Sequence, residues 1–337
     1  MLSRHFLRAK VLQTIYSFKT AALVDESDAG KNFKYNVEHL NELSALQMGC
    51  LRQFIHVNQL IIDTGLKKMM PTFEEKNPSY RLVNNAFLNR LFENYSYRQQ
   101  VENTVFPWEL HEESFNQAYL NLKHTKRYAE YMALTTVSFE DEKRMALDLF
   151  KFLMNEETVR DIFQERSLWW DDDFDQMAQY TYALLKDLND DFDESTPIPQ
   201  VFDREAMKDI DDYNFARQLL IDTIKTMDGN EQIIRRHLKG WEFERVGLID
   251  LIIINMAITE FTQCPTIPER VTIDECVELA KEFCGDKSRI FINGILEKIM
   301  IELRMSGKIN KSGRGLFIPQ DEDENFNPTN EQYPPHA

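Results

Sequence analysis

The sequence predicts an all-α fold, and three features of its composition and patterning lead to that prediction. The 337-residue chain holds only 11 glycines and 11 prolines, and no proline occurs in residues 1–70, 108–196, 200–264 or 269–318. These long runs are rich in leucine, glutamate, lysine and alanine, which favour helices. Their apolar residues recur at intervals of three and four, which is the period of a helix face. With 43% apolar residues, the chain can bury one or two cores.

The first helix is predicted from the segment SRHFLRAKVLQTIYSF, with Ser3 as its N-cap. Its apolar face is formed by Leu7, Val11, Leu12, Ile15 and Phe18. Arg4 and Arg8 lie one turn apart on a neighbouring face, where we expect both to be exposed.

The middle of the chain predicts further helices. An amphipathic helix is expected over residues 40–62, and the sequence SFED at Ser138–Asp141 predicts a capping box for the next long helix. The aspartates of WWDDDF, at 169–174, suit the start of a helix, because acids there complement the helix dipole. A metal site is the less favoured alternative, since no histidine or second acidic cluster stands at ligand spacing. The segment NDDFDESTPIPQ, at 189–200, is interpreted as a solvated linker.

The C-terminal third begins with VGLIDLIIINMAITEF, which is apolar nearly all round, as expected of a central buried helix. Pro265 and Pro268 end it. The following helix is predicted to start at a capping box of Thr272 and Glu275 and to stop at Gly285.

The segment RIFINGILEK, at 289–298, could be a hairpin, because Asn-Gly is a strong turn signal. Its apolar residues follow helical spacing instead, so we predict a helix with Gly294 inside it. A glycine there costs about 1 kcal/mol against alanine. We therefore expect Gly294 to permit a close helix crossing and Asn293 to bond across it.

The distribution of charge matters more than the net charge of −17. Residues 161–212 carry a net charge of −12, and the segment 321–337 holds five acids and no lysine or arginine. By contrast, residues 1–20 carry +4 and residues 305–320 carry +3. Such local basic patches can bind a polyanion although the chain is acidic. The alternative is that these charges only form a solvated helix face.

Other sequence features exclude several classes of protein. The four cysteines form no CxxC pair, the N-terminus has no signal-peptide core, and no apolar run has the length of a membrane span. A reduced, cytoplasmic chain without a membrane association is therefore expected. The chain also lacks P-loop, HExxH and GxSxG motifs, so neither a catalytic residue nor a cofactor is predicted.

Motifs at both ends of the chain point to one family. The segment WEFERVGLID carries Trp241, Arg245 and Asp250, and the apolar helix after it ends in an A-x-x-E pattern, Ala257 and Glu260. A proline loop then leads into residues 273–283 and to IFINGIL, while the N-terminus reads RHFLRAKVLQTIY. In these motifs the chain resembles the NusB family of transcription antitermination factors, over about residues 1–24 and 213–304.

The resemblance implies an all-helical fold of two packed bundles. Residues 1–24 and 213–304 would form the NusB-like domain, 25–212 a helical insertion, and 305–337 a basic and then acidic disordered tail. It also implies a function: binding of boxA-type single-stranded RNA together with ribosomal protein NusE, within an antitermination complex on RNA polymerase.

The resemblance further implies which residues contact the partners. The RNA-facing candidates are Arg4, Arg8, Lys10, Gln13 and Tyr16 on the first helix, and Phe283, Lys287, Arg289 and Phe291 around the last interhelical turn. Glu242 and Asp250 are the candidates for the protein partner. Phe283 and Phe291 also lie on apolar stripes, so each could belong to the core only. His5 and Phe6 stand where the family usually has arginines.

Two other functions stay open from the sequence. A helical scaffold that has lost RNA binding would keep the same fold. An accessory domain of an RNA-modifying enzyme is less favoured, because the chain has no glycine-rich cofactor loop or βαβ pattern.

Overall fold

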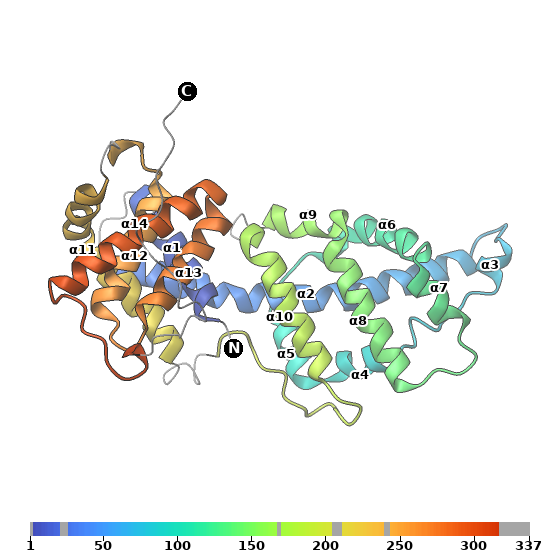
Figure 1. Cartoon of the computed structure of the whole chain (residues 1–337). Helices are drawn as coiled ribbons and strands as arrows, with labels where there is room; N and C mark the ends of the chain where they lie inside the picture. The colour runs from blue at the N-terminus through green and yellow to red at the C-terminus, as the bar shows by residue number, and fades with distance from the viewer. Residues whose placement is uncertain (1–2, 21–25, 167–169, 204–210, 239–242, 317–337) are drawn as a thin grey trace, which may run out of the picture. The chain divides into compact units, whose positions relative to one another are not determined.

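The structure, a computed structural model, describes residues 3–20, 26–166, 170–203, 211–238 and 243–316. Within these ranges every regular element is a helix and no strand occurs, which confirms the all-α prediction (Figure 1). None of the helices in the same ranges is long and apolar enough to cross a bilayer.

The helices form two compact units. Unit 1 is built mainly from residues 34–210, and unit 2 from residues 3–33 together with the chain after residue 210. Helix α2 (Glu26–Leu66) gives its first turns to unit 2 and the remainder to unit 1. The separate roles expected for residues 25–212 and for the remainder of the chain stay a prediction.

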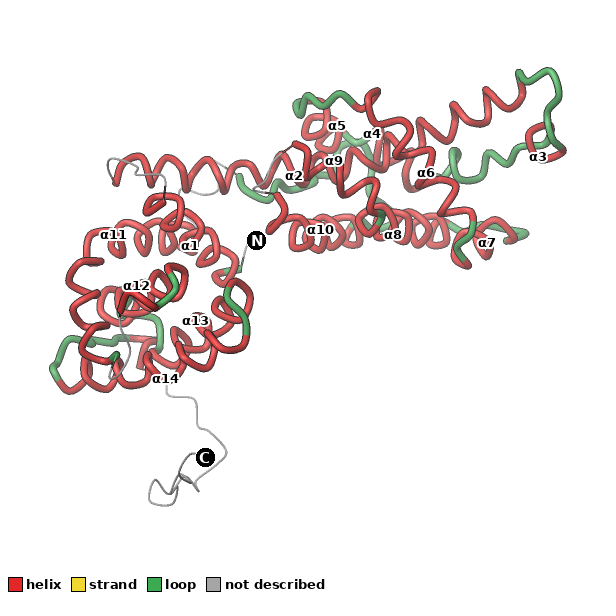
Figure 2. Tube along the Cα trace, turned by 90° about the horizontal axis from the view of Figure 1, so that it is seen from above, coloured by secondary structure: helices red, strands yellow, loops and turns green. Residues whose placement is uncertain are grey.

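Unit 2 is arranged around helix α12 (Leu248–Gln263). All ten residues from Ile252 to Phe261 are buried, as the apolar sequence predicts. Figure 2 shows the other helices of the unit around α12, and each of them packs against it. They are α1 (Arg4–Thr20), α11 (Asp211–His237), α13 (Glu269–Phe283) and α14 (Asp286–Met305).

Helix α1 packs mainly against α11 and α12, although about 200 residues of sequence separate it from them. Val11 and Ile15 are fully buried in this contact. The Ser3 hydroxyl accepts a hydrogen bond from the Phe6 N–H at 3.2 Å, which confirms the predicted N-cap. The expected packing of the N-terminal helix with the C-terminal helices is therefore confirmed.

Helix α13 begins one turn earlier than predicted. Pro268 is its N-cap and Glu269 its first residue, so the predicted capping box of Thr272 and Glu275 is wrong. Proline suits this position because the first N–H groups of a helix have no partner within it. The predicted stop at Gly285 is correct. Gly285 adopts φ 87° and its N–H bonds to the Ala280 carbonyl at 2.9 Å, as in a helix C-terminus.

The segment 289–298 lies inside α14, so the helical interpretation of the Asn-Gly pair is confirmed. The prediction of a close helix crossing at Gly294 is wrong, because a Cβ placed there would meet no heavy atom within 4 Å apart from its chain neighbours and the nearby backbone of α14 itself. Asn293 does not bond across a contact either. Its Nδ2 donates to Glu297 Oε1, one turn further along the same helix, at 3.3 Å.

Unit 1 packs shorter helices along α2, which is longer than the predicted 40–62 because it covers Glu26–Leu66 (Figure 1). Gln47 on α2 donates to the Phe174 carbonyl at 3.0 Å, and Tyr97 donates to the Met48 carbonyl at 3.2 Å. The other helices of the unit are α3 (Phe73–Lys76), α4 (Ala86–Glu93), α5 (Tyr95–Glu102), α6 (Glu112–Lys123), α7 (Lys126–Ala133), α8 (Phe139–Asn155), α9 (Glu157–Arg166) and α10 (Trp170–Asp187).

The segment 189–200 is not the solvated linker that its polar sequence suggests. Phe192 is 3% exposed and packs against Phe87, with ring centroids 5.4 Å apart. The amide of Asn94 donates to the carbonyls of Asp193 and Thr196, both at 2.8 Å. The segment is therefore part of the packed surface of unit 1.

Two further predictions in unit 1 are confirmed. Ser138 and Asp141 form the capping box of α8, and the aspartates after Trp170 occupy the first turn of α10. Over the described ranges, no group of histidine, cysteine, aspartate or glutamate side chains could hold a metal ion. All four cysteines are free thiols.

Candidate nucleic-acid interface

The two arginines of α1 lie in different surroundings. The Arg4 side chain is 43% exposed, as expected, and its Nε donates to Asp212 Oδ1 on α11 at 2.7 Å. Its guanidinium also lies 5.3 Å from the ring centroid of Phe215. An exposed guanidinium with one carboxylate neighbour can exchange that neighbour for a phosphate oxygen.

Arg8 is buried, so the prediction that it is exposed is wrong. Its residue exposure is 1%, and Nε and Nη2 each donate to one carboxylate oxygen of Glu260 at 2.9 Å. The Thr272 hydroxyl donates to the same carboxylate at 2.7 Å. A bidentate pair of this kind satisfies both charges inside the core. The arginine therefore joins α1 to α12, and its side chain is not presented to a ligand as a free cation.

Lys10, a second predicted RNA contact, is also buried, with 2% exposure. Its Nζ donates to Gln13 Oε1 at 3.0 Å and lies 5.4 Å from the Phe6 ring centroid. Gln13 is half-buried, whereas Tyr16 is 42% exposed. Of the five candidates on α1, Arg4 and Tyr16 are thus the two with exposed side chains.

His5, which the resemblance places where arginine is usual, is held between two carboxylates. Its ring nitrogens lie 2.9 Å from Glu275 and 3.3 Å from Glu282, both on α13. These hydrogen bonds raise the pKa of His5 to about 9. The imidazole is therefore a cation at neutral pH, and it fixes the start of α1 to the last turns of α13.

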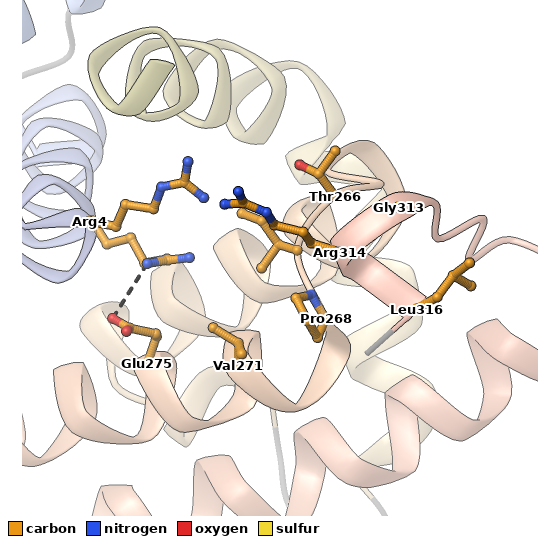
Figure 3. A pocket seen from close by; sticks show the side chains of 10 residues that line it. Arg4, Thr266, Pro268, Val271, Glu275, Gly313, Arg314 and Leu316 are labelled. Atoms are coloured by element: carbon orange, nitrogen blue, oxygen red, sulfur yellow. Dashed lines mark ion pairs between the residues drawn. The ribbon is translucent and has the colours of Figure 1, made fainter. Parts of the chain in front are cut away.

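A cleft of about 770 Å³ opens beside the first turns of α1 (Figure 3). We call it the arginine cleft, because three arginines and one glutamate are its charged lining residues. Its lining residues are Arg4, Arg8, Thr266, Ile267, Pro268, Val271, Glu275, Gly313, Arg314 and Leu316. Since Arg8 is paired with Glu260, the cations nearest to solvent are Arg4 and Arg314.

One wall of the cleft is a segment after α14, residues 308–316, which we call the C-terminal strap. Lys311 Nζ donates to the carbonyls of Glu260 at 3.2 Å and Cys264 at 2.9 Å, and so caps the end of α12. The Ser312 N–H donates to the Pro265 carbonyl at 2.9 Å. Gly315 packs so closely on that carbonyl that an added Cβ would lie 2.0 Å from its oxygen. These contacts hold the strap in place.

The second predicted set of RNA contacts surrounds the turn between α13 and α14. Lys287 is exposed and has no ion-pair partner among the described residues. The Arg289 side chain is 43% exposed, with its Nε 3.6 Å from Asp286. Phe283 and Phe291 are both half-buried, so neither is a fully enclosed core residue. Because His5 bonds to Glu282, this turn lies near the start of α1. Its role in RNA binding stays a prediction.

Of the two residues predicted to contact a protein partner, Asp250 lies within the described residues and Glu242 does not. Asp250 lies in the first turn of α12, and its Oδ2 accepts a hydrogen bond from the Ser288 hydroxyl at 3.1 Å. It therefore links the starts of α12 and α14. Glu242, like Trp241, lies outside the described residues.

Sequence reasoning missed the partner of Arg8 and the whole strap. The first could have been found from Glu260, because a carboxylate inside an apolar helix must be paired when it is buried. The strap offered only a net charge of +3 as a signal. Nothing in its sequence shows that it returns to the loop after α12.

Comparisons with known proteins agree with the motifs. A sequence model of the NusB family matches residues 174–300. The chain is 38% identical over 104 residues to the transcription antitermination protein NusB of Salinibacter ruber, covering 31% of this chain and 65% of that protein. It is 31% identical over 129 residues to that of Chloroherpeton thalassium, covering 38% and 61%, respectively.

A third relative, the transcription antitermination protein NusB of Myxococcus xanthus, is 35% identical over 96 residues, which cover 28% of this chain and 69% of the relative. The chain thus spans somewhat less than two thirds of the first two relatives and somewhat more of the third. No solved structure matches. The family model, these relatives and the motifs at both ends show that the chain belongs to the NusB family.

Proposed function

We propose that this chain is a cytoplasmic, non-enzymatic antitermination factor that binds boxA-type single-stranded RNA through unit 2, with ribosomal protein NusE as its protein partner in an RNA polymerase antitermination complex. The observation that carries the proposal is the arginine cleft, in which Arg4 of α1 lies beside residues 266–275, within the 174–300 range that the family model matches. Guanidinium groups bind phosphates, and this binding weakens as salt rises.

The surroundings of the cleft suit a single strand. Single-stranded bases are bound by stacking on aromatic rings and by edge contacts. Tyr16 is exposed on α1, and Phe283 and Phe291 are half-buried near Lys287. These residues do not line the cleft, but they belong to the same unit and offer stacking surfaces and a cation.

Fluorescence anisotropy with a labelled boxA-type RNA at several salt concentrations tests the proposal. Arg4→Ala should weaken binding about tenfold, as expected for loss of one charged hydrogen bond of roughly 1.4 kcal/mol. The slope of log affinity against log salt should shrink by about 0.7. Arg52→Ala is the matched control, because the Arg52 side chain is 46% exposed in a surface ion pair with Glu102, in unit 1.

Two outcomes contradict the proposal. If the unmodified protein binds a scrambled RNA of the same composition as tightly as the boxA-type RNA, it does not recognise that sequence. If Arg4→Ala and Arg52→Ala have the same effect, the cleft is not where RNA binds.

A protein-docking scaffold is the second candidate, and one observation in unit 1 favours it. Three apolar side chains between the end of α2 and the start of α3 are exposed: Met69 by 101%, Met70 by 91% and Phe73 by 81%. Exposed apolar side chains in a cluster are typical of protein interaction sites. Absence of any salt-dependent RNA binding would favour this candidate over the first.

A further inference from the structure

The C-terminal strap places an unpaired cation in the arginine cleft. Arg314 is exposed and makes no hydrogen bond or ion pair with a described residue. Its neighbours in the strap are fixed, because Lys311 and Ser312 bond to the carbonyls after α12 and Gly315 packs against Pro265. A charged side chain on an anchored segment loses less conformational freedom on binding than one on a free chain end.

Arg314 faces a second cation across the cleft. Figure 3 shows the guanidinium groups of Arg4 and Arg314 pointing toward one another. Arg4 bonds to Asp212 through Nε alone, so its terminal nitrogens have no hydrogen-bond partner among the described residues. Two facing guanidinium groups repel one another. An anion bound between them is attracted to both, and these two attractions outweigh the repulsion.

The other charges of the cleft are already compensated. The Glu275 carboxylate lies 2.9 Å from the His5 ring and 3.4 Å from Arg8 Nη1, so it forms ion pairs with both side chains. Arg8 itself is paired with Glu260. The remaining walls are largely apolar, with Ile267, Pro268, Val271 and Leu316. An anion between Arg4 and Arg314 would therefore meet two available guanidinium groups beside an apolar surface, where charge interactions are stronger than in open water.

We propose that the strap completes a phosphate-group site in this cleft, in which Arg314 and Arg4 together bind one phosphate. The family model matches residues 174–300, which include the wall of the cleft from Thr266 to Glu275 but neither Arg4 nor the strap. The site therefore joins a matched part of the chain to segments that lie before and after that match. The identity of the phosphate as part of an RNA backbone rests on the proposed function. The phosphate site itself does not, because a ligand without bases can test it.

Isothermal titration with inorganic tripolyphosphate tests the site directly. The unmodified protein should bind it, and Arg314→Ala should weaken binding about tenfold, as expected for one charged hydrogen bond. Lys308→Ala is the matched control, because Lys308 is an exposed cation of the same strap that does not line the cleft. It should leave binding unchanged. The site is refuted if the unmodified protein does not bind, or if the two variants bind alike.

A double-mutant cycle tests whether both arginines bind the same phosphate. The combined Arg4→Ala and Arg314→Ala variant should lose less affinity for tripolyphosphate than the product of the two single losses. Either single change already removes one of the two arginines that bind the phosphate together. Fully independent losses would refute a shared site.

Labelled boxA-type RNA then identifies the source of the phosphate. If RNA is the ligand, Arg314→Ala should reduce the salt slope by about 0.7 and Lys308→Ala should not. If tripolyphosphate binding depends on Arg314 while the unmodified protein fails to bind RNA, the phosphate site stands and the proposed function fails.

Discussion

Both units bury neutral polar side chains, but they differ in the charged side chains that they bury. Among the described residues, unit 2 buries Arg8, Lys10 and Glu260, whereas Asp173 is the one charged side chain in the buried set of unit 1. The other buried polar residues of unit 1 are neutral amides and hydroxyls. Asn85 and Asn94, for example, cap the starts of α4 and α5.

This difference shows how each unit specifies its fold. An amide cap satisfies backbone groups within a few residues and tolerates some movement. The Arg8–Glu260 pair instead joins residues 252 positions apart, and it leaves a buried charge uncompensated unless α1 is docked. Unit 2 therefore includes a buried charge pair between distant segments of the chain, whereas unit 1 uses neutral amides, which cap helices and also bond to distant carbonyls.

The largest expected effect comes from breaking that contact. Arg8→Ala should destabilise the protein by about 3–5 kcal/mol, because it leaves Glu260 charged and buried without its partner. Urea unfolding followed by circular dichroism measures the loss, and hydrogen exchange should locate it in peptides of α1, α12 and α13. Arg52→Ala, which removes a surface ion pair, should cost no more than about 1 kcal/mol.

Replacing both partners sharpens this test. Arg8→Met combined with Glu260→Leu should cost less than Arg8→Ala alone, since neither partner then leaves an unpaired charge buried. Equal losses for Arg8→Ala and Arg52→Ala would show that the buried pair does not hold unit 2 together.

In unit 1, Asn94→Ala should cost about 1–3 kcal/mol, the price of leaving buried hydrogen-bonding groups unpaired. The Asn94 Oδ1 accepts a hydrogen bond from the Tyr97 N–H at 2.9 Å, and its Nδ2 donates to the carbonyls of Asp193 and Thr196 in the 189–200 segment. Thermal unfolding gives the loss, and faster hydrogen exchange should be confined to α5 and that segment. Asn77→Ala, at an exposed helix end, should change stability by less than about 0.5 kcal/mol.

The His5 contact in unit 2 predicts a dependence on pH. Carboxylate hydrogen bonds raise the pKa of His5 to about 9 in the folded protein, against about 6.5 in an unfolded chain. The stabilisation should thus be complete below pH 6.5 and be lost as pH rises toward 9. With screening at this partly exposed site, we expect about 1–2 kcal/mol.

His5→Gln supplies the control for this prediction. The difference in unfolding free energy between the unmodified protein and His5→Gln should shrink from pH 6.5 to pH 9. A constant difference across that range would mean that the charge of His5 does not contribute.

The sequence predicts the helices of both units better than the contacts of individual polar residues. Periodicity identifies α1, α12 and α14 because apolar burial repeats along one chain segment. It cannot distinguish Arg4 from Arg8, because their environments depend on Asp212 and Glu260, which are far away in sequence. The burial of Phe192 cannot be predicted for a similar reason. The carbonyls of Phe192 and Asp193 accept hydrogen bonds from Arg90 and Asn94, which are far away in sequence.

The smallest expected effect concerns Gly294 and has the opposite sign. Gly294 lies in the interior of α14, and a Cβ there would meet no heavy atom within 4 Å apart from its chain neighbours and the nearby backbone of α14 itself. Alanine should therefore add helix propensity without a clash and raise stability by up to about 1 kcal/mol. Gly229→Ala, equally open inside α11, should give a similar gain in urea unfolding.

Gly315→Ala is the opposing control within the same unit. Its Cβ would lie 2.0 Å from the Pro265 carbonyl oxygen, so the strap must move and the protein should lose stability. If Gly294→Ala also lowers stability, close helix packing is after all what requires a glycine at that position. A gain would show that α14 packs without a close approach at Gly294, through its apolar stripe, in which Ile292, Leu296 and Ile299 are buried.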